Sequence, residues 1–378
     1  MNAAIPLALY VHWPWCVRKC PYCDFNSHES TPQEAAYLEA LIADLEAALP
    51  AIWGRPVVSV FIGGGTPSLM AGATVDALLA AIRMRLRLLP EAEITLEANP
   101  GTAEADRFKA YRDAGVNRLS LGIQSFDDAK LAALGRIHSG DQARRAIDLA
   151  LRHFGRVNLD LIYALPEQTL AEARRDIATA IATGATHLSA YHLTLEPNTA
   201  FHRAPPPLPD DDLAADMQEM FEDSLAAAGF DHYETAAFAQ PGQRCTHNLN
   251  YWRFGDYLGI GAGAHSKISD NSHPGGIRRE ARPRHPKDYL ADPVTRDWRP
   301  VAPEDLAGEF MMNALRLTEG VPLKLFGERT GLPLAAIQKS ALAGRQQGLL
   351  EAIDGALRPT ARGRRFLNRL IGLFLRDA

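Results

Sequence analysis

Three cysteines within eight residues, Cys16, Cys20 and Cys23, are the side chains whose spacing points most directly to chemistry. Cysteine thiolates are the usual ligands of iron–sulfur clusters, and short spacings let one loop surround a cluster. Three ligands for a cluster of four irons leave one iron without a protein thiolate, and a small molecule can coordinate at such an open position. The spacing therefore predicts an iron–sulfur cluster with one iron free for a ligand.

A structural zinc site is the main alternative for this loop. Such a site uses four ligands, usually in two close pairs, and the chain has no second cysteine pair. The fourth ligand would have to be His12, His28 or a distant residue. A disulfide framework is less compatible, because three clustered cysteines are an odd number and we find no export signal. We favour the cluster and keep zinc as the alternative.

Composition narrows the class of protein. The 378 residues are 47% hydrophobic and 22% charged, as in ordinary soluble globular proteins, and are enough for more than one domain. The formal net charge of −5 argues against general nucleic-acid binding. The chain has only four cysteines, which favours a reducing compartment, and no apolar run is long enough to span a bilayer. We therefore expect a soluble cytoplasmic protein that binds no nucleic acid.

The elements that must position the cysteine loop form a repeating pattern. Short apolar runs that we expect to be strands are 7–11, 57–62, 93–98, 118–123, 157–162 and 187–193. Helical patterns between them are 32–49, 73–88, 103–114, 141–152 and 170–183. Repeated strand–helix units predict a parallel sheet with helices outside it. The expected fold class is therefore α/β, an incomplete (β/α)6 TIM-like barrel that is open along one side.

Polar residues and glycines follow these strands at the ends where barrels of this kind carry their chemistry. The triple glycine after 57–62 permits close approach of the backbone to a ligand. Asp160 lies within an apolar run and needs a partner, either Arg136 or a ligand hydroxyl. Glu97 has a second interpretation as a solvated strand end. The candidate binding residues at this rim are Gly64, Gly65, Thr66, Glu97, Gln124 and Asp160.

A family resemblance adds to this interpretation of the cysteine loop and the barrel rim. The segment from Tyr10 to Cys16, the Cys-x-x-x-Cys-x-x-Cys spacing and Asp24-Phe25 resemble the radical S-adenosylmethionine (SAM) proteins related to oxygen-independent coproporphyrinogen oxidase. The resemblance implies a radical SAM barrel, a [4Fe-4S] cluster on the three cysteines, and SAM on the open iron. The positions that match the family's SAM contacts are Tyr10, Gly64, Gly65, Thr66, Glu97, Gln124, Arg136 and Asp160. One departure is Ala164, where the family usually has glycine.

Two functions occur on this family's scaffold. The oxidases carry one more cysteine two places after the third, where this chain has Phe25, and a longer segment before the first strand. The resemblance to the other branch therefore implies a heme chaperone, which binds heme and transfers it to an acceptor such as a respiratory, membrane-associated hemoprotein. It also implies an electron donor such as flavodoxin or ferredoxin, and a homodimer. Oxidative decarboxylation of coproporphyrinogen III is the alternative, and a radical SAM enzyme with another substrate stays open.

The segment His247-Asn248-Leu-Asn250-Tyr251-Trp252 is the second candidate site. An imidazole can bind heme iron axially, and tyrosine or tryptophan can pack against a porphyrin face. Alternatively, His247 and Asn248 make internal hydrogen bonds that brace a loop over the barrel mouth. The resemblance favours heme at His247, because the family shares this motif. Glycine-rich residues follow at 259–263, and His265 after them is a secondary candidate ligand.

The remaining segments suggest a division into three parts. We expect a radical SAM partial barrel at 1–204, and then a region at 205–300 with a Pro-rich linker, a helix at 213–228 and a closing strand at 233–239. A small C-terminal helical domain at 301–378 completes the chain. Its helical patterns are 306–317, 322–331, 333–347 and 362–375, and a short two-stranded wing at 348–360 makes it resemble a winged helix. Its arginines form a solvated helix face.

Overall fold

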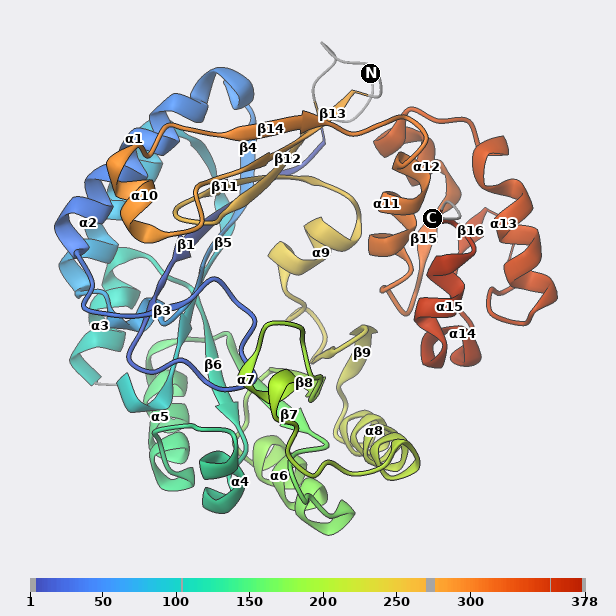
Figure 1. The fold of residues 1–378 in the computed structure, drawn as a ribbon, viewed down its shortest axis with the longest axis horizontal. Coiled ribbons are helices and arrows are strands. Elements are labelled where there is room, and N and C mark those ends of the chain that lie inside the picture. The colour runs from blue at the N-terminus through green and yellow to red at the C-terminus, as the bar shows by residue number, and fades with distance from the viewer. Residues whose placement is uncertain (1–4, 103–104, 270–275, 354, 376–378) are drawn as a thin grey trace.

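A computed structural model describes residues 5–102, 105–269, 276–353 and 355–375 (Figure 1). A twelve-stranded sheet forms the centre of the molecule. Six of its strands are parallel neighbours in chain order, as the apolar runs predict. These strands are β1 (Leu7–Trp13), β4 (Pro56–Gly64), β5 (Arg87–Ala98), β6 (Arg118–Gln124), β7 (Val157–Tyr163) and β8 (His187–His192). The incomplete six-unit barrel is therefore confirmed.

Helices cover the outer face of the six parallel strands (Figure 1). They are α1 (Glu34–Ile52), α2 (Gly72–Arg85), α3 (Ala105–Ala114), α4 (Asp128–Ala133), α5 (Gly140–His153) and α6 (Leu170–Ala182). Capping boxes that begin at Ser139 and Thr169 start α5 and α6, since each side chain accepts a backbone N–H of the first turn. The prediction of a helix up to residue 88 was wrong, because Arg87 and Leu88 pair with β4 as the start of β5.

Both edges of the parallel sheet are extended. At the β8 edge, α8 (Asp211–Ala227) precedes a hairpin of β9 (Asp231–Glu234) and β10 (Ala237–Ala239), and β10 pairs antiparallel with β8. The predicted closing strand is thus two strands. At the other edge, β11 (Asp256–Ile260) pairs parallel with β1. Antiparallel strands β12 (His265–Ser269), β13 (Ile277–Ala281) and β14 (Asp297–Pro300) follow it. The sequence patterns did not predict these last four strands.

Buried ion pairs hold the β11–β14 extension in place. Asp256 has no exposed side-chain surface and lies 2.8 Å from both Lys267 Nζ and Arg55 Nη2. Burial alone would raise the pKa of Asp256, but Lys267 and Arg55 hold it below its ordinary value. Arg282 Nε donates to Asp44 on α1, and neither side chain is exposed. These pairs tie the added strands to the barrel.

The C-terminal helices enclose a hydrophobic cluster of their own, which includes Phe310, Phe326 and Leu370. Between residues 348 and 360, Leu350 and Pro359 form an isolated antiparallel bridge, and the strand in this range pairs with residues 321–322, so the expected two-stranded wing is only partly formed. The helices and strands here are α11 (Leu306–Ala314), β15 (Val321–Pro322), α12 (Leu323–Thr330), α13 (Ala335–Gln346), β16 (Ala356–Leu357), α14 (Ala361–Arg365) and α15 (Leu367–Gly372). The predicted helix at 306–317 is shorter, and the one at 362–375 breaks at Phe366, whose backbone is not helical.

A short helix, α9 (Thr246–Trp252), lies between the sheet and the C-terminal helices (Figure 1). Its His247 is buried beside β4, where the ring lies 4.9 Å from that of Phe61. Its Leu249 and Trp252 pack against the C-terminal cluster. The helix therefore contacts both parts of the molecule. Over the residues that the structure describes, no helix has the length and apolar character needed to cross a membrane.

Candidate functional site

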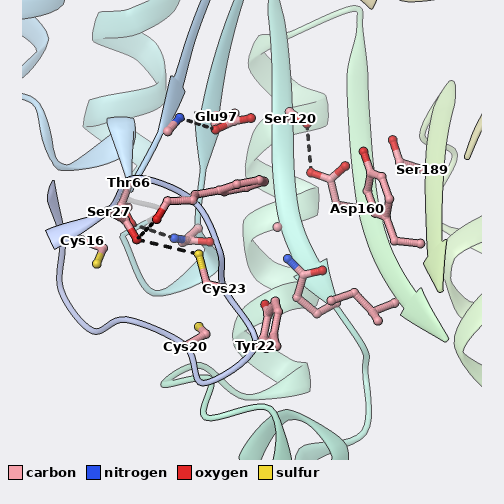
Figure 2. Close-up of a pocket in the computed structure, with 18 of the residues that line it drawn as sticks. Cys16, Cys20, Tyr22, Cys23, Ser27, Thr66, Glu97, Ser120, Asp160 and Ser189 are labelled. Carbon is pink, nitrogen blue, oxygen red and sulfur yellow. Dashed lines mark hydrogen bonds between the residues drawn. The ribbon is translucent and has the colours of Figure 1, made fainter. Parts of the chain in front are cut away.

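The cysteine loop leaves β1 through the short strand β2 (Trp15–Cys16), which pairs in parallel with β3 (His28–Glu29). Lys19 Nζ closes the loop by donating to the carbonyls of Phe25 and Ser27 at 3.0 and 3.1 Å. Figure 2 shows Cys16, Cys20 and Cys23 spaced around this loop. All three line one cavity of about 480 Å³, together with residues from the carboxyl ends of β4 to β8. The predicted rim is therefore a single site.

The three thiols are close enough to influence one another. The pKa of Cys16 is raised to about 11, chiefly by burial; a hydrogen bond with Ser27 opposes this shift, and Cys23 and Cys20 add to it. Burial also raises the pKa of Cys23, whose Sγ lies 3.7 Å from Ser27 Oγ. Bound metal reverses such shifts, because a coordinating thiol is deprotonated. Three thiols that share one cavity therefore suit a polynuclear cationic group.

The described part of the chain has no three cysteine, histidine or acidic side chains that converge as the ligands of one bare metal ion do. The thiols are instead set apart along the loop (Figure 2). Arg136 lies beside them, since its Nη1 donates to Cys20 Sγ at 3.7 Å. The donor set therefore fits a cluster held at separate corners.

The glycine turn after β4 packs tightly against the start of the cysteine loop. Gly65 N–H donates to the Trp13 carbonyl at 2.6 Å, and Thr66 N–H donates to the Trp15 carbonyl at 2.7 Å. A Cβ atom on Gly65 would collide with the backbone of Trp15, and Gly64 has a φ of +117°. These two positions require glycine. The turn thus holds the backbone of the rim directly against the cysteine loop.

Glu97 and Asp160 face the same cavity without an ion-pair partner among the described residues. Glu97 is half-buried, and its Oε2 accepts the Gly64 N–H at 3.0 Å. Burial, and then the charge of Asp160, raise the pKa of Glu97 to about 8. Asp160 accepts hydrogen bonds from Ser120 Oγ at 3.1 Å and Asn158 Nδ2 at 2.8 Å, and burial raises its pKa. A cationic ligand would lower both pKa values.

Arg136 is not the partner of Asp160. Its Nη2 donates to Asn99 Oδ1 at 2.6 Å and to the Gly122 carbonyl at 2.8 Å. It lines the cavity, as does Gln124, which ends β6 with a left-handed φ of +68°. The predicted residues that line the cavity with the cysteines are therefore Gly64, Gly65, Thr66, Glu97, Gln124, Arg136 and Asp160.

Tyr10 and His247 lie elsewhere. Tyr10 faces a second, neighbouring cavity, and its hydroxyl contacts His12 Nδ1 at 3.0 Å. His247 is 4% exposed, with its Nδ1 3.0 Å from Ser59 Oγ and its ring 5.1 Å from that of Tyr251. Burial lowers the pKa of His247 to about 4. This geometry corresponds to the bracing alternative for His247, and heme ligation there stays a prediction.

Sequence reasoning missed several polar residues of the cavity. Ser120, Asn158 and Ser189 lie on β6, β7 and β8, and Asn158 Oδ1 accepts the Ser189 hydroxyl at 3.1 Å. Ser120 pairs with Asn158 in the sheet, and Asp160 pairs with Ser189. The sequence pattern that could have identified these three residues is a polar residue at an inward position of an otherwise apolar strand. Asn99, directly after β5, also lines the cavity, and its Nδ2 donates to Thr66 Oγ1 at 3.0 Å.

Comparisons with known proteins show the family of this chain. Residues 10–180 match the radical SAM superfamily and residues 301–366 match the HemN C-terminal domain. Heme chaperone HemW of Escherichia coli (strain K12) is 48% identical, and the match covers 98% of this chain and 99% of that protein. The chain belongs to the HemW family. Another relative, mitochondrial radical S-adenosyl methionine domain-containing protein 1 of Bos taurus, is 39% identical over 83% of this chain and 74% of its own.

A solved structure shares the fold of this HemW-family chain. Coproporphyrinogen III oxidase (HemN) from Escherichia coli, a radical SAM enzyme, matches with a TM-score of 0.83 over 98% of this chain and 90% of its own. The two sequences are 24% identical, so the likeness concerns the fold alone. It confirms the expected TIM-like radical SAM architecture with its closing strands and C-terminal domain.

Proposed function

We propose that this chain holds a [4Fe-4S] cluster on Cys16, Cys20 and Cys23, binds SAM beside it, and acts as a heme chaperone that delivers heme to an acceptor hemoprotein. The observation that carries the proposal is the shared cavity, in which three thiols and two acids without cationic partners face one another. When bound, the cluster supplies an iron with an open position and a single electron that can cleave SAM reductively.

The protein's own residues would bind and orient SAM. Glu97, already an acceptor for the Gly64 N–H, can also accept from the SAM amino group. Backbone carbonyl groups of the Gly64–Gly65 turn can also accept from this amino group, because the N–H groups of both glycines already donate to Glu97 and Trp13. Asp160 can accept a ligand hydroxyl at the far side of the cavity. Arg136 can hold the Cys20 thiolate, and the tight glycine turn limits access of water.

The heme part of the proposal is supported by the relatives and by the loop. Relatives at 48% and 46% identity carry the name heme chaperone HemW. Phe25 stands where an additional cysteine would mark the oxidase branch, and its side chain is 61% exposed at the cavity. As parts of the same proposal, the acceptor is a respiratory, membrane-associated hemoprotein, and the electron donor is a flavodoxin or ferredoxin. We also propose a cytoplasmic homodimer with functional parts at 1–204, 205–300 and 301–378.

The cluster assignment is tested by anaerobic reconstitution of the full chain with iron and sulfide. Cys16→Ser, Cys20→Ser and Cys23→Ser variants should each lose bound iron and the broad visible absorbance. Cys245→Ser is the matched control, because Cys245 is buried away from the loop and should keep both signals. If the triple variant retains its iron and colour, the cluster assignment is wrong.

The function is tested by incubating reduced, reconstituted protein with SAM and either heme or coproporphyrinogen III. A chaperone should bind heme stoichiometrically, transfer it to an apo-hemoprotein, and leave coproporphyrinogen III unchanged. Formation of protoporphyrinogen IX would contradict the proposal and favour the oxidase alternative.

A further inference from the structure

The second cavity, of about 860 Å³, is not accounted for by SAM binding. It opens between β1, α9 and the strands β11 to β14, and it shares only Phe25, Gly64 and Glu97 with the first cavity. Pockets of about 300–1,000 Å³ are the size that takes cofactors. The cavity therefore has room for a ligand as large as a porphyrin next to the proposed SAM site.

Aromatic rings form much of its wall. The rings of Tyr251 on α9 and Tyr257 on β11 are stacked with centroids 4.1 Å apart, and both line the cavity. Tyr10 lines it from β1, and Phe25 stands at the boundary with the first cavity. Such rings provide flat apolar contact area, which suits a planar aromatic ligand.

His265 is the histidine in this wall that is free to coordinate. It is exposed at the start of β12, directly opposite Ala281 on β13, and its ring makes no hydrogen bond to any described residue. Burial, and then Arg279, Arg284 and Arg282, lower the pKa of His265, so a neutral ring nitrogen is available.

The two other candidate histidines are already occupied. His12 contacts the Tyr10 hydroxyl with Nδ1 and the Asn26 carbonyl with Nε2, at 3.0 and 2.8 Å. His247 lies behind the rings of Phe61 and Tyr251 and does not line the cavity. Of these three histidines, His265 is therefore the one that is available to coordinate the metal of a planar ligand in this cavity.

Charge in the wall is mixed. Arg284 is exposed, and no described residue forms an ion pair with it, while Arg282 is buried against Asp44. Glu97 and Asp297 also line the cavity. Arg284 is thus the cation that can receive a ligand carboxylate, because a guanidinium matches a carboxylate with two parallel hydrogen bonds.

We propose that this second cavity binds the heme, with His265 as an axial ligand of the iron and Arg284 as the partner of a propionate. The proposal rests on the proposed heme-binding function and names its site. Heme then lies against Tyr251 and Tyr257, beside the proposed SAM site and separated from it by Phe25. The heme and SAM sites share Glu97 and Gly64 in their walls.

The test is titration of hemin into the full chain, followed by absorbance in the Soret region. His265→Ala should weaken binding by about tenfold or more and change the iron spin state, because an axial ligand is lost. Imidazole added to a His265→Gly variant should restore the wild-type spectrum. His202→Ala is the matched control, since His202 is an exposed histidine bonded to the Leu195 carbonyl outside this cavity.

Two further variants test the location of the heme and its propionate contact separately. Ala281→Phe should fill the cavity opposite His265 and exclude heme while leaving the cluster absorbance unchanged. Arg284→Gln should weaken binding of hemin but not of its dimethyl ester, which lacks free propionates. Equal weakening for both compounds would overturn the role of Arg284.

The outcomes distinguish the site from the function. If wild-type protein binds no heme, the chaperone proposal fails and the heme site with it. If wild-type protein binds heme and the His265 variants keep its affinity and spectrum, the site is wrong while the function stands. In that case, loss of binding in a folded His247→Ala variant would place the ligand on α9.

Discussion

Two of the carboxylates on strand β5, Glu93 toward the base of the barrel and Glu97 at its mouth, have different surroundings. Glu93 is 1% exposed and lies 3.0 Å from Arg156 Nη2 and 4.0 Å from Arg118 Nε. Its oxygens accept the backbone N–H groups of Thr246 and His247, each at 3.1 Å. Burial would raise the pKa of Glu93, but the two arginines and these N–H groups hold it below its ordinary value.

Glu97 receives the Gly64 N–H and has no cation paired with it among the described residues. Its pKa is raised to about 8 by burial and Asp160. At the base of the barrel the carboxylate is therefore paired with arginines. The carboxylates at the mouth have no cation paired with them among the described residues. The difference indicates that Glu93 stabilises the fold, while Glu97 and Asp160 are available to bind a cationic ligand.

Glu93→Gln should give the largest effect of the changes that test this contrast. Removal of one partner from a buried ion pair costs about 3–5 kcal/mol, because Arg118 is left buried without its counter-charge. Urea unfolding of the purified chain measures the loss. Glu97→Gln at pH 5, where the raised pKa of Glu97 costs little stability, is the matched control and should change the unfolding free energy by less than about 1 kcal/mol. Equal losses in the two variants would remove the distinction between base and mouth.

Glu97→Gln should instead weaken the binding of SAM. Loss of a buried carboxylate that pairs with a ligand cation costs about 2 kcal/mol, or roughly thirtyfold in Kd. Calorimetric titration of SAM into anaerobically reconstituted protein measures it. Glu196→Gln, the same change at a half-buried carboxylate of the cavity wall, should leave Kd within about twofold. An unchanged Kd in the Glu97 variant would show that SAM binds without this group.

Stability without ligands should depend on pH through Glu97. Its folded pKa of about 8 lies above the ordinary 4.5, so its contribution is fully present below pH 4.5 and is lost as the pH rises through 8. The slope between these values is at most about 1.4 kcal/mol per pH unit. Urea unfolding of the wild type and Glu97→Gln at pH 5.5, 7 and 8.5 tests this, since the variant should lose less stability on going to high pH. Parallel curves would contradict the raised pKa.

The smallest expected effect is at Ala164, which has a left-handed φ of +56° at the carboxyl end of β7. Glycine adopts this conformation without strain, so Ala164→Gly should stabilise the chain by up to about 1 kcal/mol, less the packing of one methyl group. Thermal unfolding measures it. Ala146→Gly within α5 is the control and should destabilise by about 1 kcal/mol. A loss at position 164 as large as at 146 would rule out backbone strain.

The barrel and the cysteine loop were predictable because their signals are local. Apolar runs and helical periods located the six strands, and the spacing of Cys16, Cys20 and Cys23 located the loop. Glycines and acids after the strands located most of the mouth. Ala164 stood out as a departure from the family pattern, and its positive φ supplies the reason why glycine is usual there.

Strands β11 to β14 could not be predicted in the same way, because their buried charges look like exposed surface in a sequence. Lys267 and Arg282 are each no more than 2% exposed, and their partners lie on another strand (Asp256) and on a distant helix (Asp44). The Glu93 network has the same character, since α9 and β5 are far apart in the chain. The second cavity depends on these strands and was missed with them.

Helix α9 gives the C-terminal domain a direct route to both cavities. Asn248 reaches the first cavity and Tyr251 the second, while Leu249 and Trp252 are embedded among the C-terminal side chains. A hemoprotein that docked on the C-terminal domain and displaced it would pull on a seven-residue helix that contributes one side chain to the wall of each cavity. Release of heme would then be coupled to docking of the acceptor hemoprotein, without any contact between that hemoprotein and the barrel.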